Sequence, residues 1–436
     1  MHERFRYKSR DDLLQKLIDL ELELPYNEDL TPLFYPSSIS GRPVGNRFVV
    51  QPMEGYDSEN DGSPSALTER RYLRYASGGS GIIWFEAVSV TPEGRSNPHQ
   101  LWINDQNASS FARLNDKIRE IASHLGSDPL LVIQLTHSGR YSRPDGKPRP
   151  MVGAANPNLD ATHPYQLTDE DLMKIQDQFI GASFLARSSG FDVIDLKACH
   201  GYLMIDLLSA RDRPSSKYGG DESKSRFRFF LETIDRIKNE VPGIMLSTRL
   251  NISDHYRGGF GVDSYGNPDF DEPLQLVEEL GLRGIELLNI SMGSPYFNPH
   301  VSRPYNTPVP GSKLPDEHPL QGVVRMIRDT AFFQKKFPGI KMVGSAYSYL
   351  RHHSPFVGAA VLMNGDASFI GYGRNSFAYP SMPGEIEYNG KADHSKFCIT
   401  CSGCSRLIKN LRHGGCVIHD REIYGNELKK LIADGR

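Results

Sequence analysis

The residues with the clearest capacity for chemistry lie in one short segment, Lys197-Ala198-Cys199-His200-Gly201-Tyr202-Leu203. Lys197 and His200 can both donate hydrogen bonds to a developing oxyanion or to a carboxylate. Tyr202 stays protonated to about pH 10 when unperturbed, so it can supply a proton at neutral pH. Gly201 lets the chain turn tightly between these side chains. The segment predicts a site that polarises and protonates a small organic substrate; the alternative is that His200 caps a helix and Tyr202 is a core aromatic.

Four of the five cysteines gather near the C-terminus. Such tight spacing is typical of a metal site and not of a disulfide-stapled secreted protein. Four thiolates satisfy either a structural zinc ion or a 4Fe-4S cluster. Three cysteines at three-residue intervals followed by a distant fourth are more typical of iron–sulfur ligation, so we expect a cluster, with zinc as the alternative. The expected ligands are Cys398, Cys401, Cys404 and Cys416, whereas Cys199 is expected to pack beside the site.

The composition narrows the classes of function. The chain has 436 residues and a formal charge of −3, which is ample for a barrel-type domain with an appendage. Charges of both signs are interspersed, so neither a nucleic-acid nor an anionic-membrane partner is expected. The N-terminus lacks the apolar stretch of a signal peptide, and no apolar run approaches a membrane span. We therefore expect a cytoplasmic protein with a small-molecule substrate, and homo-oligomerisation stays open.

Strand-like apolar runs alternate with helix-period segments through the middle of the chain. Thr168-Asp169-Glu170-Asp171 has the capping hydroxyl and the acids of a first helical turn, and this helix ends at Ser188-Ser189-Gly190. Alternation at this spacing implies a parallel sheet, either open or closed. Strands are expected at 191–196, 243–250, 284–290 and 340–344, helices at 227–241, 273–280 and 322–337, and segments 359–362 and 368–371 close the series.

Residues suited to binding or catalysis recur at the C-terminal ends of the expected strands, at Gln134, Lys197, Arg249 and Gly344. In a barrel those ends converge on one face, whereas an open sheet gathers its ligands at one switch point. The spread over many strands predicts an α/β fold of the (β/α)8 TIM-barrel type. The expected division is an N-terminal extension that wraps the barrel or covers its base (1–45), the barrel (46–383) and a short C-terminal cysteine-cluster segment (384–436).

Residues from about Asn46 to Pro383 resemble the Old Yellow Enzyme family of FMN oxidoreductases. In that family a strand ends in His-x-x-His/Asn-Gly-Tyr-Leu, followed by Leu-Ser and Tyr-Gly-Gly. The matching stretches, specific because of their order and spacing together, are 46–53, 78–95, Gln134-Leu135-Thr136-His137-Ser138-Gly139-Arg140, 197–203, Leu208-Ser209 and Tyr218-Gly219-Gly220.

This resemblance implies roles for the segment at 197–203. His200 is the second of two donors that bind the electron-withdrawing group of the substrate, and Tyr202 protonates the α-carbon. Lys197 departs from the first donor that the family usually has. Because a lysine keeps a donor but adds a full charge, an anionic activating group such as a carboxylate is favoured alongside a carbonyl.

The resemblance also implies an FMN site, which needs a cation near the N1–C2=O edge, amide partners and a phosphate cradle. Arg249 can supply the cation, and Gln134 can supply the amide partner. Small residues after two late strands, together with Arg374, suit the phosphate. The expected FMN contacts are Pro52, Met53, Glu54, Ala87, Gln134, Arg249, Gly344, Ser345, Gly373 and Arg374, and His300 is a candidate substrate contact.

The cysteine pattern is similar to that of the iron–sulfur branch of the family, which includes 2,4-dienoyl-CoA reductase and trimethylamine dehydrogenase. Those relatives continue into FAD- and NADH-binding domains, whereas this sequence ends at Arg436. We therefore expect NAD(P)H, or a separate reduced ferredoxin or flavoprotein, as electron donor. An ene-reductase is the favoured function. An amine dehydrogenase or demethylase is disfavoured by Lys197, because such a substrate wants an aromatic cage; a third reading is an electron-transfer subunit without turnover.

Overall fold

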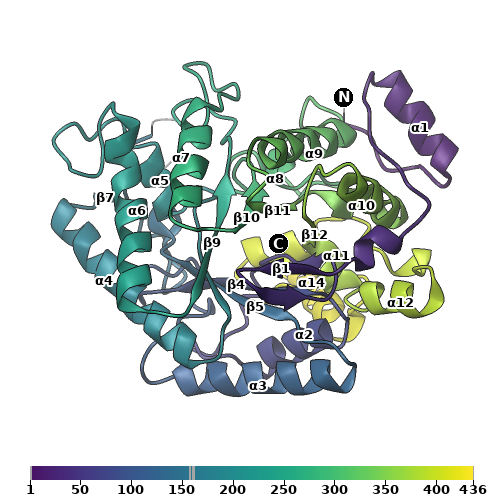
Figure 1. The fold of residues 1–436 in the computed structure, drawn as a ribbon, viewed down its shortest axis with the longest axis horizontal. Helices are drawn as coiled ribbons and strands as arrows, with labels where there is room; N and C mark the ends of the chain where they lie inside the picture. Colours follow the sequence, from purple (N-terminus) through teal and green to yellow (C-terminus); the bar gives the residue numbers. More distant parts are fainter. Residues whose placement is uncertain (1, 157–158, 160–162, 436) are drawn as a thin grey trace.

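Eight parallel strands close into a barrel in the computed structural model, which describes residues 2–156, 159 and 163–435 (Figure 1). The last strand pairs with the first, Ile370 standing opposite Phe48 and Tyr372 opposite Val50. This closure confirms the predicted TIM barrel. The strands in chain order are β3 (Phe48–Val50), β4 (Ile82–Ser89), β5 (Leu130–Thr136), β8 (Val193–Leu196), β9 (Met245–Asn251), β10 (Leu287–Ser291), β11 (Lys341–Gly344) and β12 (Phe369–Tyr372).

Helices follow the strands and cover the outside of the barrel. The helix predicted after Thr168 begins with a reciprocal cap, in which Thr168 Oγ1 accepts from the Asp171 N–H at 3.2 Å and the Asp171 carboxylate accepts from the Thr168 N–H at 2.9 Å. Residues 359–362 lie inside α10, whereas most of 368–371 belongs to β12. The outer helices are α2 (Ala66–Ala76), α3 (Ala108–His124), α4 (Asp169–Ser188), α6 (Ser223–Glu240), α7 (Asp271–Leu282), α9 (Pro319–Lys336) and α10 (Ser354–Met363), and shorter ones are α5 (Leu203–Leu208), α8 (Pro299–Ser302) and α11 (Arg374–Ala378).

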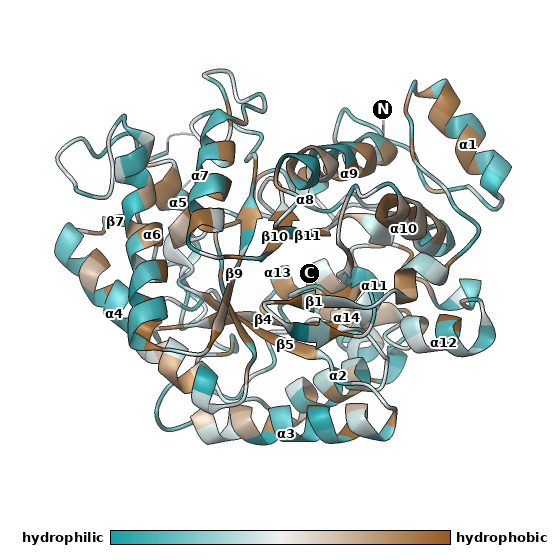
Figure 2. Cartoon of the chain, viewed as in Figure 1, coloured by the Kyte–Doolittle hydropathy of each residue, from teal (hydrophilic) through white to brown (hydrophobic). Residues whose placement is uncertain are grey.

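Strand side chains alternate between the barrel interior and the layer of helices. In β4, Ile82 and Trp84 belong to the inner apolar cluster, whereas Ile83 and Phe85 pack in the cluster that the helices cover. Figure 2 shows the brown, apolar strands and outer helices that carry teal, hydrophilic residues. Because the inner cluster uses the first residues of the strands, the opposite ends are left for polar groups.

The N-terminal segment both wraps the barrel and covers its base. Helix α1 (Arg10–Asp19) packs through Leu13 and Leu17 in a cluster that includes residues of α9 and α10. The hairpin of β1 (Ser37–Ile39) and β2 (Arg42–Val44) inserts Ile39 and Val44 into the inner apolar cluster (Figure 1). Met1 and Arg436, the outer ends of the predicted terminal segments, lie outside the described residues. The remaining short elements before the C-terminal segment are η1 (Thr31–Phe34), η2 (Gly139–Tyr141), β6 (Met151–Val152), β7 (Tyr165–Gln166) and η3 (Tyr347–His353).

The C-terminal segment folds against the barrel around a small core of its own. Leu407, Val417, Tyr424 and Leu431 form that core. Among the described helices, none is long and apolar enough to cross a membrane. The elements of this part are α12 (Met382–Asn389), η4 (His394–Lys396), α13 (Gly403–Lys409), η5 (Arg421–Gly425) and α14 (Asn426–Ala433).

Candidate active site

A cavity of about 1060 Å³ opens at the C-terminal ends of the barrel strands. Gln134, Lys197 and Arg249, three of the strand-end residues singled out in the sequence, all line it. The loop after β10 and the C-terminal cysteine segment complete the wall. Its further lining residues include Gln51, Pro52, Met53, Glu54, Tyr56, Tyr141, His200, Tyr296, His300, Arg303, Ser345, Gly371, Gly373, Arg374 and Cys404.

Lys197 lies in the cavity wall with its charge paired. Its Nζ donates to Glu54 Oε1 at 3.0 Å, and only 3% of the Lys197 side chain is exposed. The same carboxylate oxygen accepts a hydrogen bond from the Tyr202 hydroxyl at 3.1 Å. The Lys197 ammonium also lies 3.6 Å from the centroid of the Tyr202 ring. Glu54 thus contacts two of the predicted catalytic residues. The contact between Glu54 and FMN that the sequence suggests remains a prediction.

His200 faces the cavity from a left-handed backbone conformation. Its φ is 63° and that of Gly201 is 75°, so the chain reverses directly after β8. His200 Nε2 lies 2.9 Å from Ser291 Oγ at the end of β10. Burial, and then the charges of Arg249 and Lys197, hold the pKa of His200 well below its usual range. A neutral imidazole beside a charged lysine can polarise a ligand without adding a second positive charge.

Tyr202 lies behind the cavity wall. It exposes 1% of its surface and is absent from the described residues that line the cavity, whereas Tyr296 lines the cavity with 48% of its surface exposed. The two hydroxyl oxygens are 3.1 Å apart. Tyr56 also lines the cavity and hydrogen-bonds to Ser96 Oγ at 2.8 Å. Tyr56 was not among the residues expected in the site, because it lies just beyond the matching stretch at 46–53 and belongs to no motif. Tyr296 lies in the turn- and aromatic-rich stretch 292–300, which the sequence suggests as a wall of the substrate pocket, and the structure places it in the cavity wall.

Gln134 and Arg249 are held by a carboxylate inside the barrel. Asp195 Oδ2 accepts from Gln134 Nε2 at 2.6 Å and from the Trp84 indole at 2.7 Å, while Oδ1 accepts from the Arg249 N–H at 2.6 Å. Burial raises the pKa of Asp195 to about 6 despite these donors. The Arg249 guanidinium donates to the amide oxygen of Gln51. These contacts orient an amide and a cation toward the cavity, as a flavin requires.

Two arginines whose charges interact, Arg303 and Arg374, also line the cavity. Arg374 is 5% exposed and donates to the Pro304 carbonyl at 2.6 Å, but its Nη1 is buried without a hydrogen-bond partner among the described residues. Arg303 donates to Ser405 Oγ, and its buried Nε likewise has no partner in the described part of the chain. Burial and the charge of Arg374 lower the pKa of Arg303. Two crowded guanidinium groups with spare donors fit the phosphate of FMN.

Glycine is needed at Gly371 in β12, where a Cβ atom would lie 2.7 Å from the Gly344 carbonyl oxygen of the neighbouring strand. At Gly373 a Cβ atom would lie 2.9 Å from Met53 Sδ, which is part of a flexible side chain. Ser345, which directly follows β11, also lines the cavity and donates to the Ile290 carbonyl at 2.9 Å. Gly344 lies directly before it in β11. Ala87 lies in β4 with its carbonyl accepting from Gln100 at 2.9 Å, and it stands outside the described cavity wall.

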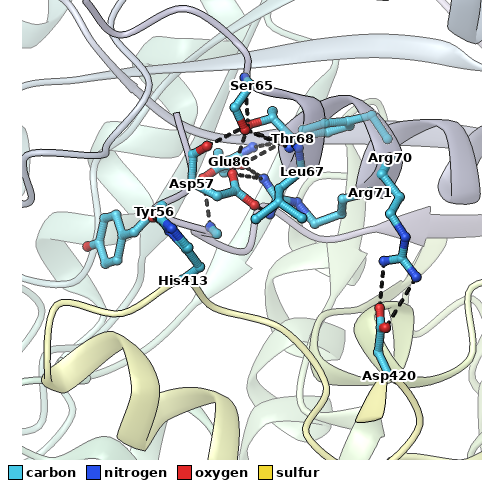
Figure 3. A network of polar contacts seen from close by, with 12 residues as sticks. Tyr56, Asp57, Ser65, Leu67, Thr68, Arg70, Arg71, Glu86, His413 and Asp420 are labelled. Atoms are coloured by element: carbon cyan, nitrogen blue, oxygen red, sulfur yellow. Dashed lines mark hydrogen bonds and ion pairs between the residues drawn. The ribbon is translucent and has the colours of Figure 1, made fainter. Parts of the chain in front are cut away.

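The loop that carries Glu54 and Tyr56 rests on a buried ion-pair network (Figure 3). Arg71 of α2 pairs with both Asp57 and Glu86, and Glu86 Oε2 accepts from the Gly55 N–H at 2.7 Å. The C-terminal segment contacts this same loop, because His413 Nδ1 lies 2.6 Å from the Tyr56 carbonyl oxygen. Asp420 of the C-terminal segment also contacts α2, accepting from Arg70 at 2.7 Å and from Arg74 at 2.8 Å; Figure 3 shows the contact with Arg70.

The four clustered cysteines are unpaired thiols in the folded chain. Backbone N–H groups point at two of the sulfurs, from Thr400 to Cys398 Sγ at 3.3 Å and from His419 to Cys416 Sγ at 3.4 Å. Cys404 lines the cavity. Among the described residues, no group of three or more His, Cys, Asp or Glu side chains is placed to hold a metal ion. Cys199 is fully buried beside Lys197, as predicted.

The predicted substrate contact His300 reaches the cavity from α8. Its Nε2 lies 3.7 Å from Glu317 Oε1, and that carboxylate is also paired with Arg325 at 2.6 Å. Burial lowers the pKa of His300, although Glu317 opposes the shift. His300 is thus placed in the wall, and its role as a substrate contact stays a prediction.

Comparison with known proteins identifies the family. The NADH:flavin oxidoreductase / NADH oxidase family matches residues 32–270, more than half of the chain. The chain belongs to this family. It is 31% identical over 265 residues to the NADPH dehydrogenase of Bacillus subtilis strain 168, covering 60% of this chain and 73% of the relative. It is 27% identical over 398 residues to the NADH oxidase of Thermoanaerobacter brockii, covering 87% of this chain and 54% of the relative.

Solved structures share the fold. The 2-naphthoyl-CoA reductase structure has a TM-score of 0.72 at 21% identity, with 92% of this chain and 58% of that chain covered. The Old Yellow Enzyme homologue from Zymomonas mobilis has a TM-score of 0.61 at 20% identity, with 83% and 94% covered. The resemblance inferred from the motifs is confirmed. The protein is a flavin-dependent oxidoreductase, and its family supports FMN as cofactor and NAD(P)H as reductant.

Proposed function

We propose that this enzyme is an ene-reductase, which reduces an activated carbon–carbon double bond. When bound and reduced, FMN supplies the hydride. Lys197 and His200 bind the carbonyl or carboxylate that activates the alkene, and a tyrosine hydroxyl gives a proton to the α-carbon. Arg249 and Gln134 would hold the isoalloxazine edge, and Arg303 and Arg374 would hold the phosphate.

The observation that supports this proposal most is the arrangement around Glu54. One carboxylate oxygen accepts from both Lys197 Nζ and the Tyr202 hydroxyl, at 3.0 and 3.1 Å, in the wall of the cavity. A cationic donor suited to an activating group and the hydroxyl of a tyrosine thus share one carboxylate oxygen, which supports the proposal. Burial, and then the charge of Glu54, keep the pKa of Tyr202 well above its usual value, so its phenol stays a proton source at neutral pH.

The test is a two-step anaerobic reaction of the purified protein. NADPH or NADH should bleach the flavin absorbance, and an added alkene should restore it with formation of the saturated product. Probes that separate neutral from anionic activation are 2-cyclohexenone and trans-cinnamate. Bleaching by NAD(P)H without recovery by either alkene, while oxygen restores the colour, would exclude ene-reduction.

We further propose that the four C-terminal cysteines bind a 4Fe-4S cluster through which electrons can reach FMN. The support is a donor set of four free thiols, with backbone N–H groups aimed at two sulfurs and Cys404 at the cavity wall. Iron and acid-labile sulfide analysis of anaerobically purified protein should give four of each per chain, as expected for this cluster type. Stoichiometric zinc without sulfide would overturn the proposal. Reduction by NADH but not by a reduced ferredoxin would reject electron entry through the cluster.

Amine oxidation is a second candidate because Glu54 neutralises Lys197. In the sequence, Lys197 in the pocket argues against an amine substrate, and that objection weakens because the lysine is paired with Glu54 at 3.0 Å. Tyr141 and Tyr296, stacked with centroids 3.8 Å apart, also line the cavity and offer aromatic faces to a cation. Structural neighbours at 21% and 18% identity are described as a histamine dehydrogenase and a 6-hydroxypseudooxynicotine amine oxidase. Anaerobic bleaching of the flavin by histamine or trimethylamine would favour this function.

A further inference from the structure

The loop that carries Glu54 is held by the C-terminal segment through two consecutive backbone carbonyls. The Gly55 carbonyl oxygen accepts from the Gly414 N–H at 2.6 Å. The Tyr56 carbonyl oxygen lies 2.6 Å from His413 Nδ1, and since a carbonyl can only accept, that nitrogen carries the hydrogen (Figure 3). The backbone directly after Glu54 is thus anchored by a side chain 357 positions away from Tyr56.

This backbone needs external support because Tyr56 has a left-handed conformation. Its φ is 46°, which is unfavourable for a residue with a Cβ atom. Such a conformation persists only where the surrounding contacts fix it. The Gly55 N–H donates to Glu86 Oε2 at 2.7 Å, and a Cβ atom on Gly55 would overlap the Arg71 guanidinium. Gly55 therefore contacts both the buried ion-pair network and the C-terminal segment.

His413 is itself placed by contacts around the same loop. Its ring packs edge-on against His99, with ring centroids 5.5 Å apart and an interplanar angle of 75°. His99 Nδ1 lies 3.1 Å from the Ser58 carbonyl oxygen, so each of the two histidines contacts a carbonyl of this loop. The next residue, Gly414, is closely packed as well, since a Cβ atom there would lie 3.0 Å from the Glu54 carbonyl oxygen. These contacts fix His413 relative to the backbone of Glu54.

Glu54 is the carboxylate that balances the charge of Lys197. Glu54 Oε1 accepts from Lys197 Nζ at 3.0 Å, and both side chains line the cavity. An opposite charge at this distance lowers the attraction of the ammonium for an anionic ligand. That compensation depends on where the backbone places Glu54, because ion pairs and hydrogen bonds both weaken as their atoms separate. The anchors at Gly55 and Tyr56 therefore bear on which ligand charges the cavity accepts.

We propose that His413 is a positioning residue that sets the ligand charge selectivity of the cavity through Glu54. Its hydrogen bond to the Tyr56 carbonyl holds the adjoining backbone, and that backbone holds the Glu54 carboxylate against Lys197. Without this hydrogen bond the ammonium is less compensated, so anionic ligands bind more tightly. His413 is absent from the described residues that line the cavity, so it acts on a ligand through the loop and not by contact.

Variants at residue 413 separate the hydrogen bond from the bulk of the side chain. His413→Leu removes the donor, whereas His413→Asn has nearly the shape of the leucine and keeps an amide N–H for the Tyr56 carbonyl. His413→Ala replaces the leucine variant if the latter does not fold. The matched control is His352→Ala, because His352 Nε2 also contacts a backbone carbonyl, that of Lys8 at 3.2 Å, and His352 is absent from the described cavity wall.

Each FMN-loaded variant of the whole chain is titrated with benzoate and with neutral benzamide through the flavin absorbance, alone and combined with Glu54→Gln, and its melting temperature is recorded. We expect His413→Leu to bind benzoate about three- to tenfold more tightly with unchanged benzamide affinity, an effect of the size typical for coupling through packed contacts. His413→Asn and His352→Ala should match the wild type. In the Glu54→Gln background His413→Leu should add nothing, because both changes act on the same ion pair.

Four results would each overturn this role of His413. They are unchanged benzoate affinity in His413→Leu, equal changes for benzoate and benzamide, no rescue by His413→Asn, and an effect that persists in the Glu54→Gln background. Benzoate binding to the oxidised flavin involves no turnover, so these results are independent of the proposed ene-reduction. A protein that shows the expected binding but reduces no alkene would reject the proposed function and leave the role of His413 in place.

Discussion

Lys197 Nζ and Glu54 Oε1 form an ion pair 3.0 Å long in the wall of the cavity. The two residues are 143 positions apart and come from the ends of β8 and β3. The lysine that replaces the usual family donor is thus matched by a carboxylate from the loop after another strand. The pair keeps a strong donor in the site without a net positive charge, which bears directly on the charge of the ligands that the cavity accepts.

Glu54→Gln should make the cavity select anions. The change leaves the Lys197 ammonium unpaired, so benzoate should bind about tenfold more tightly or better, as expected when about 1.4 kcal/mol of compensating attraction is removed. Titration of the flavin spectrum with benzoate measures this, with benzamide as the neutral control. The double variant Lys197→Met with Glu54→Gln should bind benzoate no better than the wild type. Equal benzoate affinity in Glu54→Gln and the wild type would show that Lys197 does not face the ligand.

The positions of Gln134, Lys197 and Arg249 could be predicted from the sequence because strand ends in a closed parallel barrel must converge. Helix α4 was equally predictable, since Thr168 and Asp171 form a cap within four residues. In both cases the information is local or follows from strand order. The barrel and the general place of the site therefore followed from pattern alone.

The partners of those residues could not be predicted in the same way. Glu54 was expected to contact FMN, and nothing near it in sequence indicates that it pairs with Lys197. Tyr296 lies among turn-forming residues, and its contact with Tyr202 spans 94 positions. Such contacts depend on loop conformation and on left-handed residues such as His200, whose φ is 63°. Loop geometry between non-neighbouring segments is set by tertiary packing, which a single sequence does not reveal.

Arg374→Met should release FMN more readily than the wild type does. Loss of a charge-assisted hydrogen bond of about 1.5–3 kcal/mol weakens binding by about 10- to 100-fold. Arg303→Met should weaken it as well, because Arg303 also lines the cavity beside Arg374 and has a spare buried Nε. Fluorescence of free FMN after ultrafiltration gives the dissociation constant. Arg236→Gln on the outer face of α6 serves as control, and unchanged FMN affinity in Arg374→Met would place the phosphate elsewhere.

Acidification should destabilise the fold through His137. Burial lowers the pKa of His137 to about 4, and its Nδ1 accepts from the Gly139 N–H at 3.1 Å. Because the folded pKa lies below the unfolded value of about 6.5, the stabilisation is present above pH 6.5 and is lost as the pH falls toward 4. In that window the free energy of unfolding should change by up to about 1.4 kcal/mol per pH unit from this residue.

His137→Asn tests this because the asparagine oxygen can accept the Gly139 N–H without titrating. Urea unfolding at half-unit intervals from pH 4 to 7 should show a shallower loss of stability than in the wild type. Above pH 7 the two proteins should differ by a constant amount. Identical slopes below pH 6.5 would mean that His137 titrates alike in the folded and unfolded chains.

Cys404→Ala should remove the proposed cluster while leaving FMN in place. Cys404 supplies one of four expected thiolates and lies at the cavity wall, whereas the flavin contacts proposed above all lie outside the C-terminal cysteine segment. Loss of one ligand should therefore lower iron and sulfide per chain sharply, while FMN per chain stays close to that of the wild type. Cys199→Ala, at a fully buried cysteine beside Lys197, is the matched control and should retain both groups. Full iron content in Cys404→Ala, or its loss in Cys199→Ala, would contradict the assignment of the four C-terminal cysteines.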